Sequence, residues 1–582
     1  MRSGSAATIS GWEANHKRIR ASARRGWSIP LAAGTITSDP RACEIPTFTG
    51  ETDSIENQAP NPDADERHAE KPAPPKIDLS LIRFRPDGKA DVARLFISLL
   101  GSIYLIAFLS LAVQVRLLIG EGGLLPVRAV LPRVHDFMGS GSYLMFPTIF
   151  WAGAGDTALI AWAWVGVVLS FLLILGIGTR PVLILLWALY LSYVTAGRDF
   201  FSFQWDNLIL EASVVAWFLP NYWGPWWRRG EARKPPSALS IFLLGWLFFR
   251  LYFESGLSKL LARDSSWVSL EAMGIYHETA PLPTILGWYA HQLPTWIQHL
   301  STALSIAVEL ILPFALFAPR WIRSYVFVVL MGFQMSIFLT AGYGFFNPLS
   351  AILGLCLLDD GHIARLRSWL PSRTSVERRL SRPAVRGWIV WAVRWGLASL
   401  ILIQSFSTGW IALARKPLPE WMMRVGWVLQ PYRVANAYHL FADITHRRLE
   451  VEIAGSRDGI EWRPYRFRYK PGDPERVPGF VAPHQPRVDF QLWFFAFPGD
   501  PGRREYFNNL VMRLCERDSP VLALFEEDPF PEGPPDRVRV RLYDYRMTDS
   551  ATLEETGRYW DRKLVIEFDE IYRCGSAVPP RY

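Results

Sequence analysis

One long uncharged apolar run constrains this chain more than any other feature of its sequence. Residues 95–115 contain no Asp, Glu, Lys or Arg, and the run is as long as the ~20 residues that an α-helix needs to cross the hydrocarbon core of a bilayer. Only 20% of the chain is charged, although half of it is apolar, whereas soluble domains are roughly 25% charged. We therefore predict a transmembrane helix here, in a protein whose partners include membrane lipids.

Further apolar runs follow this one and predict a polytopic α-helical membrane bundle between residues 93 and 415. Several of them are short for a complete span, so we expect nine crossings within a range of about five to nine. The runs cover residues 95–115, 157–177, 181–196, 208–219, 238–261, 297–317, 321–340, 345–358 and 394–410.

Basic clusters between the runs predict the orientation, because Lys and Arg near membrane ends are retained on the cytoplasmic side. With a cytoplasmic N-terminus and nine crossings, the clusters at Arg180, 228–234, Arg320 and 365–382 all fall inside. Everything after residue 410 then falls outside, in a periplasm or lumen. Three basic residues fall on the outer side against the rule: Arg116, Arg128 and Arg133.

Two polar regions flank the predicted bundle. Residues 1–92 are rich in Pro, Ser and charged residues, which predicts a disordered cytoplasmic leader. Residues 430–582 predict an extracytoplasmic β-rich domain with an antiparallel β-sandwich-like fold, and a short helix around 504–515. Its strands are indicated by apolar residues that alternate with charged neighbours: Leu449, Val451 and Ile453; Val538, Val540 and Leu542; Leu564, Ile566 and Phe568.

The cysteines and the charge distribution exclude several classes of protein. Cys515 and Cys574 both lie in the tail, where they either form a disulfide in an oxidising compartment or remain two buried free thiols. The net charge of +8 is scattered between apolar runs, so we expect no nucleic-acid partner. Zinc-ligand spacings, phosphate loops and nucleophile elbows are absent from the sequence, and we expect no metal or cofactor.

Charged residues inside the apolar runs are functional candidates, because each costs roughly 2.5–3.5 kcal/mol to insert into a membrane. Arg250 and Glu254 are four residues apart and predict an ion pair on one helix face. Lys259 either extends to the lipid headgroups or pairs with Glu254 or another carboxylate. Glu211 and Glu309 have apolar neighbours on both sides and are expected to face the bundle interior.

Several polar and aromatic strings resemble the lipase maturation factor family. These are TAGRDFFSFQWDNLILEASVVAWFLP (195–220), GLSKL (256–260) with Trp267, YHETAPLPTILGWYAHQLP (276–294), NAYHLFADITHRRLEVEIAGSRDGIEWRPYRFRYKPGD (436–473) and VAPHQPRVDFQLWFFA (481–496). The resemblance covers roughly residues 95–570. It implies a polytopic membrane protein, whose animal members help newly made homodimeric lipases to reach an active fold in the endoplasmic reticulum.

The expected function is therefore that of a membrane-embedded folding factor for secreted lipases or similar exported clients, more a chaperone than an enzyme. Exposed aromatic patches mark interaction sites, so the strings at 276–294 and 481–496 are candidate client surfaces. Phe490, Leu492 and Phe494 alternate, however, which favours a strand that buries them on one face of the sandwich. The client-binding candidates are His277, Glu278, Pro281, Trp288, His484, Phe490 and Trp493.

An enzyme is the alternative. The segment YFESGLSKLLARDSSW (252–267) is similar to the membrane segment of vitamin K-dependent gamma-carboxylases in which a lysine acts as a base. Lys259 occupies the matching position and is the candidate catalytic residue, because desolvation lowers the pKa of a lysine.

Glycosylation and retention signals bear on the compartment. No Asn lies in an Asn-x-Ser/Thr sequon, and the chain ends in PPRY without a retention tetrapeptide. We therefore favour a bacterial inner membrane with a periplasmic tail, and keep the endoplasmic reticulum membrane as the alternative.

Overall fold

The computed structural model describes residues 88–227, 235–369, 387–414, 416–497, 505–517, 519–569 and 571–576. All of them belong to one compact unit, Leu81–Tyr582. The predicted leader lies outside the described residues, apart from its last five positions.

Six of the described helices are long and apolar enough to cross a membrane, which lies within the predicted range. Each begins or ends within a few residues of a predicted run, because an apolar run of this length has its backbone hydrogen bonds satisfied only as a helix. They are α2 (Ala90–Ala112), α6 (Asp156–Ile174), α7 (Thr179–Gly197), α9 (Ala238–Leu261), α13 (Arg320–Thr340) and α16 (Gly387–Ala414).

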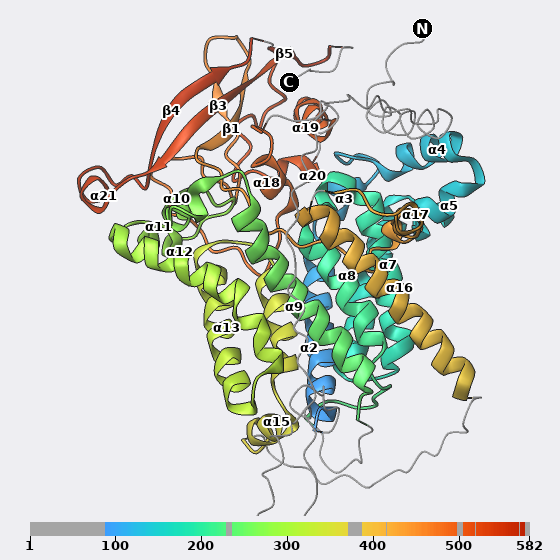
Figure 1. Ribbon diagram of the computed structural model, residues 1–582. Coiled ribbons are helices and arrows are strands. Elements are labelled where there is room, and N and C mark those ends of the chain that lie inside the picture. Colours follow the sequence, from blue (N-terminus) through green and yellow to red (C-terminus); the bar gives the residue numbers. More distant parts are fainter. Residues whose placement is uncertain are drawn as a thin grey trace, which may run out of the picture. The chain divides into compact units, whose positions relative to one another are not determined.

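The other three predicted runs form shorter helical elements beside the long ones (Figure 1). Pro313 lies at the start of a 3-10 helix, and since proline lacks a backbone N–H it ends the preceding α-helix. The shorter elements are α8 (Gln204–Trp217), α12 (Thr295–Leu310) with η6 (Leu312–Phe317), and α14 (Phe346–Leu353) with η7 (Gly354–Leu357).

Helix α2 lies inside the bundle, and its contact with α6 is close. Phe108 of α2 is fully buried, and a Cβ added to Gly166 of α6 would lie 2.5 Å from the Phe108 ring. Small residues allow such an approach in membrane bundles.

Shorter helices connect or cap these elements: α3 (Val115–Ile119), α4 (Val127–Met138), α5 (Ser142–Met145), α10 (Ala272–Thr279), α11 (Ile285–His291), α15 (Asp360–Arg367) and α17 (Glu420–Leu429), with 3-10 turns η2 (Gly139–Gly141), η3 (Ile149–Ala152), η4 (Arg198–Phe201), η5 (Ser265–Trp267) and η8 (Gln430–Tyr432).

The tail contains an antiparallel sheet of five strands in the order β2-β1-β3-β4, with β5 paired to β3. Strands are present at all three predicted places, and Val451 lies opposite Leu542 as Ile453 lies opposite Val540. The third strand ends at Glu567, before Phe568, and its Leu564 and Ile566 are exposed, so the buried face that the alternation predicts is wrong for this strand. The strands are β1 (Arg448–Ser456), β2 (Arg463–Pro464), β3 (Arg537–Met547), β4 (Trp560–Glu567) and β5 (Tyr572–Arg573).

The described residues contain this single open sheet, in place of the two sheets of the expected sandwich. Val538 and Val540 of β3 belong to the same buried apolar core as Phe507 and Leu510, and the helix that carries Phe507 and Leu510 is joined by a disulfide to the residue after β5, so a helix and not a second sheet lies beside this one. That helix is α19 (Glu505–Glu516), which confirms the predicted helix near 504–515, and α20 (Ser519–Leu522) follows it.

The prediction of a strand at Phe490, Leu492 and Phe494 is wrong. Residues Arg487–Leu492 form helix α18, in which every side chain is buried. A helix buried on all sides shows no helical period, so the sequence pattern could not distinguish it from a strand. Pro486 directly precedes the first turn, a place where the preset backbone angle of proline suits a helix start.

The disulfide Cys515–Cys574 joins α19 to the residue that follows β5. Of the two alternatives left open by the sequence, the structure contains the disulfide. Cys356 is buried and free.

The two ends of α2 contact different parts of the chain. At its N-terminal end Lys89 pairs with Asp359 at 2.9 Å, and the Asp360 carboxylate accepts the backbone N–H groups of Ala90, Asp91 and Val92. Just beyond its C-terminal end Gln114 donates to the Gln485 carbonyl oxygen of the tail at 2.8 Å. The tail thus meets α2 at the end opposite the junction with the leader.

Candidate functional site

Buried charges in the helices converge on the first residues of the tail. The Arg250 guanidinium donates to Glu211 Oε1 at 2.7 Å and to Glu254 Oε1 at 3.0 Å, so the predicted ion pair with Glu254 is confirmed and Glu211 joins it. The third donor group of Arg250 contacts the carbonyl oxygen of Asn436. All of the side-chain oxygens that accept from Arg250 lie on α8 and α9.

The tail also donates hydrogen bonds to the carboxylates of Glu211 and Glu254. Glu211 Oε2 accepts from the Asn436 backbone N–H and the Tyr438 hydroxyl, both at 2.8 Å. Glu254 Oε2 accepts from the Tyr438 backbone N–H at 3.0 Å. Each carboxylate therefore uses one oxygen for Arg250 and the other for the tail, which satisfies the buried charges. We call residues 436–440 the tail anchor.

Lys259 forms a second buried contact with the tail anchor. Its ammonium lies 2.6 Å from Glu309 Oε2 and 2.9 Å from the Leu440 carbonyl oxygen, with the Ser255 carbonyl oxygen at 3.5 Å. Its side chain is only 3% exposed, so it does not extend to the headgroups. Three acceptors match the three N–H donors of an ammonium, and the arrangement is that of a paired cation.

A third buried ion pair joins α8 to α18. Arg487 forms a bidentate pair with Asp206, with N–O distances of 2.9 and 2.7 Å. The Tyr190 hydroxyl donates to the same carboxylate at 2.6 Å, and the Phe201 ring lies 3.7 Å from the guanidinium carbon. Asp206 follows the aromatic string FFSFQW in the sequence, but nothing in the sequence shows that Arg487 is its partner.

The segment 276–294, which includes the end of α10 and all of α11, contacts the sheet through a fourth group of charges. Glu278 pairs with Arg546 at 2.9 Å and accepts the Met547 backbone N–H at 2.9 Å. Arg448, which is fully buried, donates to the carbonyl oxygens of Glu278 and Pro281 at 3.1 and 3.0 Å. Trp288 lies in a small buried cluster with Tyr545, Met547 and Trp560.

The seven client-binding candidates therefore lie where the segment 276–294, the helical bundle and the tail meet. His277, Glu278, Pro281, Trp288 and Phe490 are buried, while His484 and Trp493 are half-buried. Trp493 donates to the Thr279 carbonyl oxygen at 2.9 Å and His484 Nδ1 lies 2.9 Å from the Ser110 hydroxyl. Burial lowers the pKa of His277 to about 4. A role of these residues in client binding stays a prediction.

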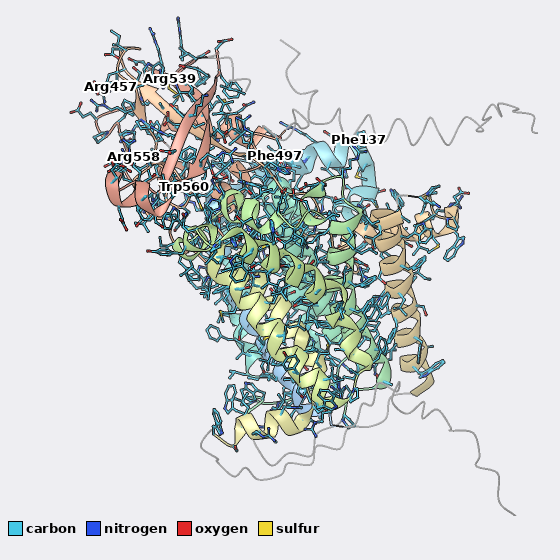
Figure 2. All side chains as sticks on the ribbon, turned by 60° about the vertical axis from the view of Figure 1, so that its left-hand side comes forward. Phe137, Arg457, Phe497, Arg539, Arg558 and Trp560 are labelled. Atoms are coloured by element: carbon cyan, nitrogen blue, oxygen red, sulfur yellow. A yellow bond between two sulfur atoms is a disulfide. The ribbon has the colours of Figure 1, made fainter. Side chains whose placement is uncertain are left out.

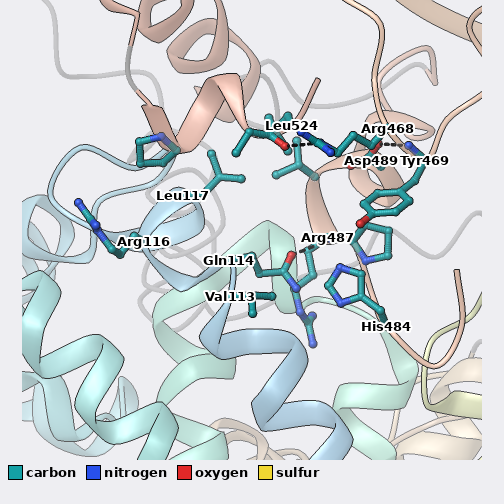
Figure 3. A pocket seen from close by; sticks show the side chains of 14 residues that line it. Val113, Gln114, Arg116, Leu117, Arg468, Tyr469, His484, Arg487, Asp489 and Leu524 are labelled. Carbon is teal, nitrogen blue, oxygen red and sulfur yellow. Dashed lines mark hydrogen bonds between the residues drawn. The ribbon is translucent and has the colours of Figure 1, made fainter. Parts of the chain in front are cut away.

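A cavity of about 360 Å³ lies between α2, α3 and the tail. Figure 3 shows Gln114, His484, Arg487 and Asp489 around it, and Arg116 and Arg468 also line it. Asp489 is 2% exposed, and burial raises its pKa to about 7 although Lys470 opposes the shift. The residues that line the cavity come from both sides of the contact between the helices and the tail. Within the part of the chain that the structure describes, no group of three or more His, Cys, Asp or Glu residues could hold a metal ion.

Comparison with known proteins adds two family matches. The lipase maturation factor transmembrane domain matches residues 92–365, and the lipase maturation factor C-terminal domain matches residues 434–570. Lipase maturation factor 2 of Homo sapiens is 30% identical over 585 residues, covering 82% of each chain. The chain belongs to the lipase maturation factor family.

Other relatives agree with this assignment. Lipase maturation factor 1 of Mus musculus is 30% identical and covers 83% of this chain and 85% of its own, and the Bos taurus protein of that name is 30% identical with 83% and 87%. No solved structure matches the chain. The two regions that the family defines are the ones joined here by Arg250, Lys259 and Asp206, since these residues lie in the first region and the tail anchor and Arg487 lie in the second.

Proposed function

We propose that this member of the lipase maturation factor family promotes the folding or assembly of secreted lipases or similar exported clients. The names of its relatives support the class of function. The observation that carries the proposal is the sharing of Glu211 and Glu254 between Arg250 and the tail anchor. It implies a membrane domain that holds a soluble domain in a fixed position. A fixed platform suits a factor that receives unfolded chains as they leave the membrane.

We further propose that the tail lies outside the cytoplasm. The basic residues Lys89, Arg323 and Arg367 gather near the N-terminal end of α2, where they pair with Asp359 and Asp91, and basic residues favour the cytoplasmic side. The tail contacts the other end of α2, and its disulfide suits an oxidising compartment. The absence of Asn-x-Ser/Thr sequons favours a bacterial inner membrane over the endoplasmic reticulum membrane.

The test is co-expression of the full chain with a secreted lipase, followed by measurement of lipase activity per amount of lipase protein. We expect the chain to raise this specific activity without changing the amount of lipase made. The double variant Asn436→Ala/Tyr438→Phe should lose most of the effect, because both side chains donate to Glu211.

His439→Ala is the matched control, since this exposed side chain lies in the same segment and should tolerate the change. If the specific activity of the lipase is the same with and without the chain, the proposed function is wrong. If the double variant performs like the wild type, the role of the tail anchor is wrong and the class of function remains.

A further inference from the structure

Strand β4 forms an open edge of the tail sheet (Figure 1). It pairs with β3 on one side, and among the described residues no strand pairs with its other side. After Trp560, every residue of β4 is exposed. Figure 2 shows Trp560 at the end of the sheet nearest the helices and Arg457 and Arg539 at the far end, so the strand extends away from the bundle.

The centre of this edge is apolar. Leu564, Val565 and Ile566 are 43%, 38% and 43% exposed. The register with β3 passes from Leu564, opposite Tyr543, to Ile566, opposite Leu542, so Val565 has no partner residue in β3. Soluble proteins protect edge strands with charges, short length or a covering element, because an exposed apolar edge pairs with other chains. An edge with three consecutive exposed apolar residues is therefore suited to binding a strand.

We infer that β4 is the site where the tail captures an extended apolar segment of its client, by adding that segment to the sheet as a further antiparallel strand. This inference rests on the proposed function and names its contact surface. Main-chain hydrogen bonds supply affinity in such strand addition, and side chains supply selectivity. Partly folded proteins expose the unpaired strands that this mode of binding requires.

The charges beside the apolar centre define the chemistry of the partner. Lys563 precedes the three apolar residues, and Glu567 follows them and also pairs with Arg541 of β3 at 3.0 Å. An antiparallel partner therefore places a basic residue opposite Glu567 and an acidic residue opposite Lys563, and cross-strand pairs of opposite charge are favourable. The preferred segment reads, from its N-terminus, basic, three apolar, acidic. Residues 563–567, KLVIE, have this order themselves.

A peptide with the sequence of residues 560–569 is therefore the probe. Its binding to the purified full-length protein in nanodiscs is measured by fluorescence anisotropy, beside a peptide of the same composition in which the two charges are exchanged. We expect the first peptide to bind at least about tenfold more tightly. Equal affinities, or the absence of binding by either peptide, would overturn the inference.

Val565→Pro tests whether the backbone of β4 is the contact. Proline removes the N–H and obstructs an incoming strand, and Val565 lies at the bulge, where the register leaves it without a paired residue in β3. We expect affinity for the peptide to fall about tenfold, while the matched variant Val565→Thr keeps affinity near that of the wild type. Unchanged affinity of the proline variant contradicts the inference.

Three further readouts make the outcome specific. The same resistance to limited proteolysis as the wild type, with the Cys515–Cys574 disulfide formed, shows that the tail of each variant is folded. A Val565→Cys variant that becomes a disulfide-linked dimer in the membrane would show that a second copy occupies the edge, and would overturn the inference. In the lipase assay, if Val565→Pro raises lipase activity as much as the wild type does, the β4 site alone is overturned. If the wild type itself does not raise lipase activity, the proposed function is overturned.

Discussion

Lys259 is the residue on which two accounts of this protein differ. As a base it would need a free lone pair, whereas the structure surrounds its ammonium with Glu309 and two carbonyl oxygens. Removing one partner of a buried ion pair costs roughly 3–5 kcal/mol, and replacing both with neutral groups of similar size is often close to neutral. The pair therefore provides a test that separates packing from chemistry.

We predict that Lys259→Met and Glu309→Gln each lower the thermal stability of the protein, and that the double variant regains most of the loss. The double variant should also retain its effect on the specific activity of a co-expressed lipase. A double variant that is stable but has no effect on the lipase would show that the amine itself is required, as in the carboxylase-like alternative.

Asp489 gives the tail a pH dependence of defined sign. Its pKa in the folded protein is raised to about 7 by burial, whereas an ordinary Asp titrates near 3.9. Between these values the folded state holds a proton that the unfolded state has lost, so the free energy of unfolding falls as the pH rises through this window. The loss is about 1.4 kcal/mol for each pH unit of the shift.

We therefore expect Asp489→Asn to be more stable than the wild type at pH 7.5, and to lose this advantage as the pH falls towards 4.5. Urea unfolding at both values measures it, and because the other titrating groups are common to both proteins, the difference isolates Asp489. An equal pH dependence in the two proteins would contradict the assigned burial.

At the scale of elements, the disulfide between α19 and the end of β5 stabilises the tail alone. It closes a loop with a sequence separation of 59 residues, for which the chain-entropy relation gives about 4 kcal/mol. We predict that Cys515→Ser/Cys574→Ser exposes the tail to proteolysis at lower urea concentrations, while proteolysis of the helices is unchanged. Simultaneous loss of both would show that the two parts unfold as one unit.

Elements with a clear period were predictable from the sequence, and elements without one were not. Strand β3 alternates apolar and charged residues because one face is buried. Strand β1 shows the same alternation although both of its faces are largely buried, and the long helices follow from uncharged runs of sufficient length. Helix α18 is buried on every side, so its sequence has neither period. The second sheet of a sandwich was expected because alternation shows that one face is covered, but it does not show whether a sheet or a helix covers it.

Of the candidate site, the charged residues in the helices were predictable from the sequence, but their partners in the tail were not. A charge inside an apolar run is visible in the sequence, and Glu211, Arg250, Glu254, Lys259 and Glu309 were all found in this way. Their partners in the tail include the side chains of Asn436 and Tyr438, but the other contacts are with backbone groups at Asn436, Tyr438 and Leu440, and a backbone group has no signature in a sequence. Arg487 is separated from Asp206 by most of the chain, and nothing local to either residue indicates the pair.

At the scale of the whole molecule, the account depends on the tail and the leader lying on opposite sides of the membrane. The tail contacts the C-terminal end of α2, and the leader joins its N-terminal end. Two cysteines can report the two sides, because Cys43 lies in the leader and Val565→Cys adds a thiol to the exposed edge of the sheet. Cys356 is buried.

The most direct test labels the Val565→Cys variant with a membrane-impermeant maleimide in sealed vesicles of known orientation. In right-side-out vesicles the account predicts labelling at position 565 and protection of Cys43, and in inverted vesicles the reverse. Labelling of both positions in the same sealed vesicles, or of Cys43 alone in right-side-out vesicles, would contradict it.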